Sequence, residues 1–335
     1  MIADLTELPD QVQPLIKRAA DCGEDIAAAL PVAVEVGELL PAPGGGRTLQ
    51  RWAVLAALGR ANLTAARVTE AHTDALAILA EAGRTDVPDG AWGVFAAEAP
   101  DQLLLAATDG RATVLSGVKP WCSLADVLDR ALVTAHVDGG RRLFEIDLHQ
   151  AGVRVERSRG WVARGLRTVT SVPIHCDAVP ATPVGDVDWY LTRDGFAWGG
   201  IGVAACWYGG AIGVADRLYQ VAARRHSELD ALHLGTVDVA LHAAAAVLTI
   251  AAADVDSGNA RGARGELLAH RVRAVVADAA ELVLCQVGHA LGPGPLAFDA
   301  EHAARVADLE LYVRQHHAER DLATLGGLLL SEERR

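Results

Sequence analysis

Apolar positions recur at helical spacing in the first part of the chain. They do so over residues 5–20 and, after the break LPAPGGG at residues 40–46, over residues 49–82. Gly83 is a suitable stop for the second segment, because glycine readily ends helices. We therefore predict an N-terminal helical domain of residues 1–91, in which residues 49–82 form one long helix. His72 lies in this helix, where a core or solvated position is expected rather than a ligand role.

The spacing changes to period two after residue 91, which is typical of strands. Short apolar runs are separated by turn signals at Asp109-Gly110, Asp138-Gly139-Gly140 and Ala151-Gly152. The runs cover residues 103–107, 112–115, 131–137, 143–148, 153–155 and 169–174. Closely spaced strands with hairpin-type turns predict a central antiparallel β-barrel or sandwich domain of residues 92–194.

Helical spacing returns after Asp194 and continues to the end. Four segments with wide apolar faces are joined by short connections, at residues 198–225, 234–255, 266–289 and 303–325. This pattern predicts a C-terminal four-helix bundle of residues 195–335, and an α+β fold for the whole chain. The alanine-rich faces at residues 243–246 and 251–253 exceed what a monomer core needs. We therefore predict a homo-oligomer, either a homodimer or a homotetramer.

A stretch without charged residues, 196–215, is long enough to cross a bilayer. Six of its residues are glycine, which favours a buried helix that neighbouring helices can approach closely. The first residues include Asp4 and Glu7 and show no basic region before an apolar core, so a secretory signal is not indicated. The sequence therefore predicts a cytoplasmic protein with no membrane association.

Composition agrees with a helical protein and excludes one class of partner. Of the 335 residues, 51% are hydrophobic but only 4% are aromatic, and much of the apolar fraction is alanine. The net charge of −13 would repel a phosphate backbone, so no nucleic acid partner is expected. The five cysteines form no CxxC pair and are predicted to be small buried residues in a reducing compartment, with neither a disulfide framework nor a zinc site. They are Cys22, Cys122, Cys176, Cys206 and Cys285.

The first candidate for binding chemistry is in residues 115–136, LSGVKPWCSLADVLDRALVTAH. Trp121 directly follows a proline in a turn, and Ser123 lies two positions further on. A flat apolar ring beside a hydroxyl suits a planar heteroaromatic ligand with polar edges. The alternative interpretation is a buried tryptophan that closes one end of a sheet.

The order of the three parts and several strings resemble the acyl-CoA dehydrogenase superfamily of FAD-dependent flavoproteins. The family motif G-x-K-x-W-x-[ST] is matched by Gly117, Lys119, Trp121 and Ser123. Further similar strings are GLRTVTSVPIHCDAVPA at residues 165–181, GGAIGVADRLYQVAARR at 209–225 and CQVGHALGPGPLAFD at 285–299. The chain looks like a short, divergent member of this family, with the acyl-CoA dehydrogenase-like arrangement of domains.

The resemblance implies an FAD cofactor between the β domain and the bundle, with part of the site completed by a neighbouring subunit. It places Trp121, Cys122 and Ser123 beside the flavin ring. The pyrophosphate would be met by Arg224 or Arg225, and the adenine end by the glycine-rich segment with Gly288 and Gly292. The alternative for the arginines is a solvated helix end favoured by the helix dipole.

The sequence departs from the family where the catalytic base is expected. With Asp308 as the anchor, Tyr312 falls on the family's tyrosine, but His316 falls on the position of its glutamate. Residues 199–215, the other place for a base, contain no carboxylate, and the family's G-S-D loop is replaced by AAEAPDQLL at residues 96–104. His316 is therefore the candidate base, because imidazole titrates near neutral pH.

The string YVRQHHAERD, residues 312–321, is interpreted as a helix. His316 and Arg320 would then share one face, and His317 and Asp321 another. Glu319 is a second catalytic candidate. The alternatives are an ion-paired helix exterior and, with less support, a metal site, because adjacent histidines point about 100° apart on a helix. No metal is predicted.

Three functions remain open. The first is α,β-dehydrogenation of an acyl-CoA or related thioester with His316 as an atypical base. The second is a flavin-dependent monooxygenase of the same fold that is served by a separate flavin reductase. The third is a non-catalytic or half-active subunit of a heteromeric dehydrogenase. The first is favoured because the flavin turn and the order of parts match, while nothing specific marks a hydroxylase pocket.

Overall fold

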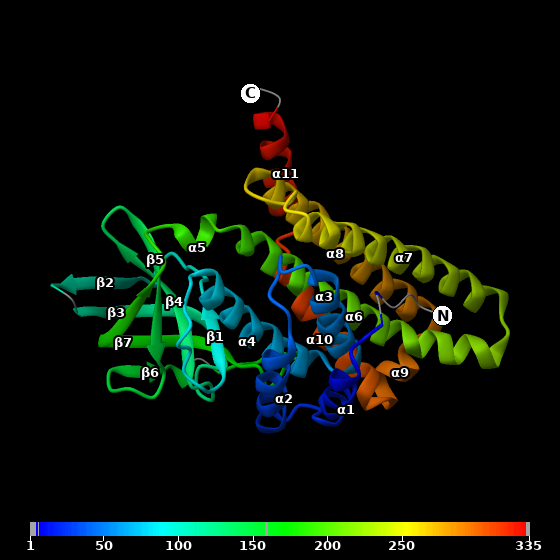
Figure 1. The fold of residues 1–335 in the computed structure, drawn as a ribbon. Helices are drawn as coiled ribbons and strands as arrows, with labels where there is room; N and C mark the ends of the chain where they lie inside the picture. Colours follow the sequence, from blue (N-terminus) through cyan, green and yellow to red (C-terminus); the bar gives the residue numbers. More distant parts are fainter. Residues whose placement is uncertain (1–4, 6, 111, 158–159, 333–335) are drawn as a thin grey trace.

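The chain consists of a β-sheet region beside a larger helical body (Figure 1). The structure, a computed structural model, describes residues 5, 7–110, 112–157 and 160–332. The succession of helices, strands and helices follows the predicted order, and the mixture of helix and strand is confirmed.

In its described residues, the N-terminal part contains four α-helices and one short 3₁₀ helix. They are η1 (Asp10–Val12), α1 (Gln13–Asp21), α2 (Ile26–Leu39), α3 (Thr48–Ala61) and α4 (Leu63–Glu81). The prediction of a single helix over residues 49–82 is wrong, because the chain breaks at Asn62. The Asn62 side chain accepts a hydrogen bond from the Ala65 backbone at 2.9 Å and donates one to the Gly23 carbonyl at 2.9 Å. Asparagine is a favoured N-cap, so it starts a new helix here.

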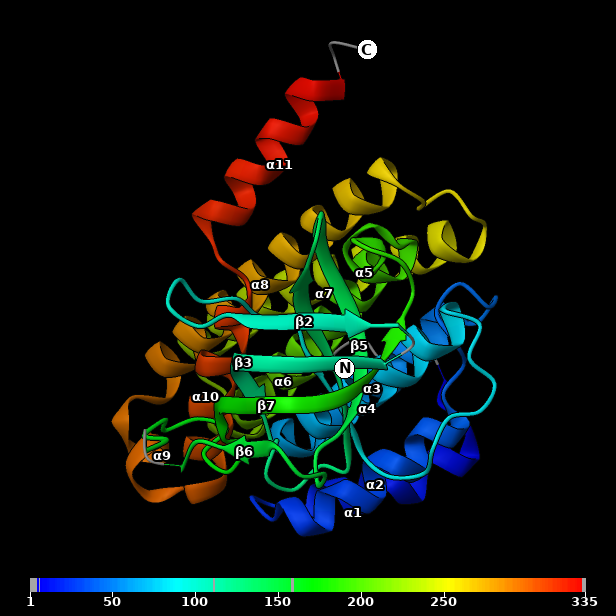
Figure 2. The same cartoon turned by 90° about the vertical axis from the view of Figure 1, so that its left-hand side faces the viewer.

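The strands are β1 (Trp92–Phe95), β2 (Leu104–Asp109), β3 (Ala112–Ser123), β4 (Arg130–Val137), β5 (Gly140–Asp147), β6 (Val153–Val155) and β7 (Ser171–Val184). Neighbouring strands follow the order β1-β4-β2-β3-β7-β5, and β5 also pairs with β4. The sheet is not purely antiparallel as predicted, since β4 runs parallel to both β1 and β2. Strand β6 pairs with β7 (Figure 2).

The C-terminal part consists of α5 (Trp189–Thr192), α6 (Asp194–Arg225), α7 (Glu228–Asp256), α8 (Ala263–Leu291), α9 (Pro293–Phe298), α10 (Ala300–Tyr312), η3 (Val313–Gln315) and α11 (Glu319–Glu332). The predicted helix over residues 303–325 is interrupted. Its second half, α11, projects from the body of the molecule (Figure 2).

The interruption lies at residues 316–318, where His316 is extended and Ala318 has a φ of 47°. The Asp321 carboxylate accepts a hydrogen bond from the His317 backbone N–H at 3.1 Å. A side chain that bonds a backbone group just before a helix competes with continuation of the preceding helix. The expectation that residues 312–321 form one helix is therefore wrong.

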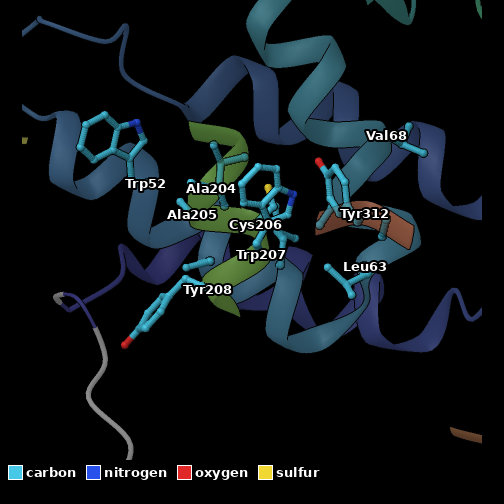
Figure 3. Packing of buried hydrophobic residues seen from close by; sticks show 14 of the residues in the cluster. Trp52, Leu63, Val68, Ala204, Ala205, Cys206, Trp207, Tyr208 and Tyr312 are labelled. Atoms are coloured by element: carbon cyan, nitrogen blue, oxygen red, sulfur yellow. The ribbon is translucent and has the colours of Figure 1, made fainter. Parts of the chain in front are cut away.

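Helix α6 is at the centre of the core, where its Trp207 packs among buried residues of other helices (Figure 3). It also crosses α3 at very short range. A Cβ atom at Gly209 would lie 1.9 Å from the Ala56 carbonyl oxygen, and one at Gly59 would lie 2.4 Å from the Cys206 carbonyl oxygen. Glycine on both helices is what permits this contact. Trp207 beside it is fully buried.

Among the described residues, three helices are long and apolar enough to cross a membrane by length and composition. The apolar window of α6 is 78% buried inside the molecule, which agrees with the predicted buried helix. The corresponding windows of α7 and α8 are only 39% buried, so both helices present apolar side chains outward.

The five cysteines are all free thiols, and four of them are buried as predicted. Cys285 differs, because it lies on the exposed side of α8, where its Sγ is 3.7 Å from His289 Nε2. On the exposed side of a helix, a small apolar residue can face outward without cost to the core.

Candidate functional site

Trp121 is presented outward by a strained bulge in β3. The register between β3 and β7 shifts between Lys119 and Cys122, and Trp121 has a φ of 58° in the left-handed region. Its flanking residues are buried, whereas Trp121 itself is 59% exposed. A bulky residue in this conformation costs free energy and persists only where the surroundings impose it. The interpretation of Trp121 as a core plug is therefore wrong.

The buried residues Lys119 and Cys122, on either side of Trp121, hold this bulge in place. The ammonium group of Lys119 is buried and donates to Glu98 Oε1 at 2.6 Å and to Thr134 Oγ1 at 2.8 Å. Cys122 also points inward, and its thiol donates to the Lys119 carbonyl at 3.3 Å. Burial raises the pKa of the Cys122 thiol, so it stays protonated. Cys122 thus supports the turn and does not face the cavity described next.

Trp121 and Ser123 line a cavity of about 700 Å³, which we call the tryptophan cavity. It lies between the sheet, α4 and the connection from α10 to α11. Ser123 Oγ is 2.8 Å from Ser171 Oγ and accepts a hydrogen bond from Arg67 Nη2 at 3.3 Å. The volume and the mixture of aromatic and polar walls are typical of small-molecule and cofactor sites. Trp161 contributes a second indole to the lining.

Helix α4 brings charged side chains to this cavity. Arg67 forms an ion pair with Glu70 at 2.9 Å, and the Tyr312 hydroxyl donates to Glu70 Oε2 at 3.2 Å. Burial raises the pKa of Glu70, while Arg67 opposes this rise. Arg67 and Tyr312 together hold the Glu70 carboxylate in place, so this carboxylate has little freedom to act on a ligand.

A second cavity, of about 740 Å³, adjoins the first one, and we call it the α6–α8 cavity. It is bounded by α5, α6, the start of α8 and the start of α11. Four residues line both cavities: Asp74, Tyr190, Gln315 and His317. The two cavities therefore meet at these residues.

Asp74 is the carboxylate at this junction. It makes no hydrogen bond and no ion pair within 4 Å among the residues that the structure describes. Burial raises the pKa of its carboxyl group, and the guanidinium groups of Arg193 and Arg51 partly offset the rise. An unpaired carboxyl with a raised pKa in a cavity is a candidate for ligand binding or proton transfer.

The structure places His316 away from both cavities. Its ring is buried against Trp207, with ring centres 6.5 Å apart, and burial lowers its pKa. The next residue, His317, lines both cavities instead. Glu319 begins α11 on the exposed surface. The helical-face argument for His316 fails because residues 313–318 are not α-helical.

The remaining predicted cofactor contacts lie at the opposite end of the bundle from the sheet (Figure 1). Arg224 and Arg225 end α6, and Gly288 and Gly292 are at the end of α8. In the described part of this single chain, none of the four lines the tryptophan cavity. Trp121 and Ser123 are thus the two predicted cofactor residues that the fold brings together in one site.

Sequence reasoning missed Arg67, Glu70 and Asp74 on α4. The signal was present in the string RVTEAHTD at residues 67–74, where charged residues recur at positions 67, 70 and 74. Such spacing puts the three side chains near one face of the helix. His72 points to the other side, where its Nδ1 accepts from the Trp92 backbone at 3.2 Å, and its expected core position is confirmed.

By sequence, no family model and no curated protein matches this chain. By structure, it is similar to KijD3 in complex with FMN and dTDP-3-amino-2,3,6-trideoxy-4-keto-3-methyl-D-glucose, with 18% identity, a TM-score of 0.80 and coverage of 99% of this chain and 96% of that one. It is also similar to TdsC from Paenibacillus sp. A11-2 in complex with FMN and indole, with 13% identity, a TM-score of 0.79 and 96% of each chain covered.

A third similar structure is butyryl-CoA dehydrogenase from Megasphaera elsdenii, with 17% identity, a TM-score of 0.76 and coverage of 97% of this chain and 99% of that one. These likenesses extend over nearly the full length in each case. They show that the chain has the acyl-CoA dehydrogenase fold, as its sequence motifs predicted.

Proposed function

We propose that this protein is a flavin-dependent oxidoreductase in which Trp121 forms one wall of the flavin-ring site. The observation that carries the proposal is the exposed indole, held on strained backbone at the edge of a cavity of about 700 Å³. Folding does not need this exposure, so a ligand is the simplest reason for it. KijD3 and TdsC, which share the fold, are both described in complex with FMN.

The residues around Trp121 fit a flavin ring chemically. The indole offers a flat apolar face, while Ser123, Ser171 and Arg67 offer hydroxyl and guanidinium groups to the polar edge of a ring. A bound flavin would supply hydride and single-electron transfer, and in its reduced form reactivity with oxygen. The chain itself would supply orientation, exclusion of water and proton transfer.

FAD and FMN make different demands on this chain. The sequence resemblance implies FAD, whose pyrophosphate would be met by Arg224 or Arg225. Because these residues lie far from Trp121 in one chain, they can serve an FAD at this cavity only from a second copy. FMN needs no such contribution. Extraction of the cofactor and its identification by chromatography distinguish the two.

For the reaction we propose monooxygenation in preference to dehydrogenation of an acyl-CoA. The α6–α8 cavity, which would admit the substrate, is lined by four carboxylates and two arginines. Both arginines are engaged, Arg193 with Glu81 at 2.6 Å and Arg273 with the carbonyls of Gly200 and Gln315. The phosphates of coenzyme A would meet repulsion here. His317 and Asp74 are the groups that could exchange protons with a substrate at the junction.

Dehydrogenation remains the second candidate because of Asp74. A carboxyl whose pKa is raised by burial is suited to proton abstraction, and it stands where the two cavities meet. One comparison separates the two reactions: butyryl-CoA is added to the flavin-loaded protein without oxygen, and a trial substrate is added separately with reduced flavin and oxygen. Loss of the visible flavin absorbance in the first supports dehydrogenation, and substrate oxidation only in the second supports monooxygenation.

The proposed function itself is tested by the visible spectrum of the purified protein. We expect absorbance from a bound flavin, or its appearance when FMN or FAD is added. Titration of FMN and FAD, followed by quenching of flavin fluorescence, gives the affinity. Failure of both flavins to bind at micromolar concentration would exclude a flavoenzyme role for this chain, as a monooxygenase or as a dehydrogenase.

A further inference from the structure

We propose that the α6–α8 cavity selects substrates that carry a cationic nitrogen, such as a primary amine, and that Asp74 binds this nitrogen. The inference rests on the proposed function for the identity of the adjoining cavity, and it adds the class of substrate. It follows from how the charged groups around the cavity are paired.

Asp74 is the one carboxylate at the junction that has been left without a partner among the described residues. It is held between α4 and α6, because a Cβ atom at Gly199 would lie 2.8 Å from Asp74 Oδ1. The glycine therefore makes room for the carboxylate. The guanidinium of Arg51 acts on Asp74 only through its charge, because its own hydrogen bonds go to the carbonyls of Pro41 and Thr73, at 3.1 Å and 2.8 Å.

The other carboxylates of the cavity have their own partners or lie at its rim. Asp194 accepts from the Gly262 backbone at 2.8 Å, and Asp321 accepts from the His317 backbone at 3.1 Å. Glu266 is exposed in the first turn of α8. An inner carboxylate without a direct ion pair inside an acidic cavity favours a cation, since a buried charge is costly until it is paired.

The arginines do not cancel this preference. Arg273 lies over the Trp207 ring, 4.7 Å from its centre, and both ends of its guanidinium are bonded to backbone carbonyls. Arg193 is buried and paired with Glu81. Both guanidinium groups are therefore held by protein oxygens as fixed parts of the wall, and Arg193 Nε is the buried donor between them that has no hydrogen-bond partner among the described residues. The overall charge of −13 adds a field that attracts cations.

The remaining wall suits an apolar body attached to the nitrogen. Phe196, which is 44% exposed, meets Tyr190 edge-on with ring centres 5.4 Å apart, and both rings line the cavity. A ligand whose cation is at Asp74 and whose apolar part lies along these rings would have its nitrogen at the junction. That end of the substrate would then face the tryptophan cavity, where the proposed flavin ring lies.

The test compares phenethylamine, 2-phenylethanol and 3-phenylpropionate, which share a phenyl group and differ in charge. Binding to the protein is measured by saturation-transfer NMR and calorimetry, with flavin and without it. We expect the amine to bind most tightly, and Asp74→Asn to weaken it on the order of tenfold or more while leaving the alcohol unchanged. Asp238→Asn, on α7 outside the cavity, is the matched control.

Equal or tighter binding of the alcohol or the acid, no binding of the amine, or an Asp74→Asn variant that binds the amine normally would each overturn the proposal. Thermal unfolding of Asp74→Asn verifies that the variant is folded. The flavin titration in the same samples separates the two proposals: flavin binding without amine preference removes this inference alone, whereas absence of flavin binding removes the proposed function.

Discussion

At the scale of single residues, the site depends on a conformation that works against stability. Trp121 occupies the left-handed region, which is natural for glycine but strained for an indole-bearing residue. Its neighbours Lys119 and Cys122 are buried and hold the chain in this shape. The conformation of Trp121 therefore lowers the stability of the protein while it serves the proposed flavin binding, and substitutions at this position can measure the two effects separately.

We predict that Trp121→Gly weakens flavin binding by at least tenfold, yet raises the stability of the flavin-free protein by about 1 kcal/mol because the strain is relieved. Trp121→Ala should weaken binding equally without this gain, since alanine remains strained at positive φ. Flavin titration and thermal unfolding measure the two effects. A glycine variant no more stable than the alanine variant would argue against backbone strain at this residue.

A second prediction concerns His72, whose pKa is lowered by burial to about 4. Because the folded protein disfavours the protonated ring, stability from this residue is complete above the ordinary pKa near 6.5 and is lost as the pH falls from 6.5 towards 4. The loss should reach about 3 kcal/mol. Denaturant unfolding of His72→Gln should show a shallower dependence on pH over this window than the wild type, whereas His242→Gln, at an exposed position, should retain the wild-type slope.

At the scale of elements, the contact of α3 with α6 depends on glycine, whereas a glycine in α7 does not have this role. Gly209 is packed against the backbone of Ala56, whereas Gly235 in α7 has nothing within 4 Å of an added Cβ. The same substitution should therefore have opposite effects at the two positions.

We expect Gly209→Ala to destabilise the protein by about 3 kcal/mol, because α3 and α6 would have to separate. Gly235→Ala should stabilise it by about 0.5 to 1 kcal/mol, through lower backbone entropy in the unfolded chain. Denaturant unfolding measures both. Similar effects of the two substitutions would mean that the close crossing of α3 and α6 does not limit packing.

At the scale of the whole molecule, α7 leaves an apolar stripe uncovered. Its exposed residues Leu229, Leu232, Val239 and Ile250 recur at spacings that fall on one side of the helix. An exposed apolar stripe on one side of a helix is typical of an interface between subunits. This agrees with the homo-oligomer predicted from the alanine-rich faces, which remains a proposal.

We predict that the double substitution Val239→Glu and Ile250→Glu lowers the sedimentation mass to that of a monomer. If the bound cofactor is FAD met by a second copy's Arg224 or Arg225, its affinity should fall together with the mass, while FMN affinity should not. Leu105→Glu, on an exposed strand position of the sheet, is the matched control. A wild type that is monomeric at all concentrations would remove the interface.

Much of the fold could be predicted from local pattern. The order of helices and strands, the buried α6 and the fold itself all follow from periodicity and from short motifs, because these signals depend on residues near one another in the chain. The breaks at Asn62 and at residues 316–318 were missed. In both, a side chain bonds the backbone and competes with a helical pattern that otherwise continues.

The sequence by itself determined that Trp121 and Ser123 stand side by side in a turn, because Gly117 to Ser123 is a local motif. Only the tertiary structure decided which histidine faces a cavity and that Asp74 stands without a partner. Both depend on elements far apart in sequence, because α4, α6 and the start of α11 meet at the junction. The interruption of the helix at residues 316–318 is what leaves His317 and not His316 at the cavities. Periodicity contains no information on such long-range contacts.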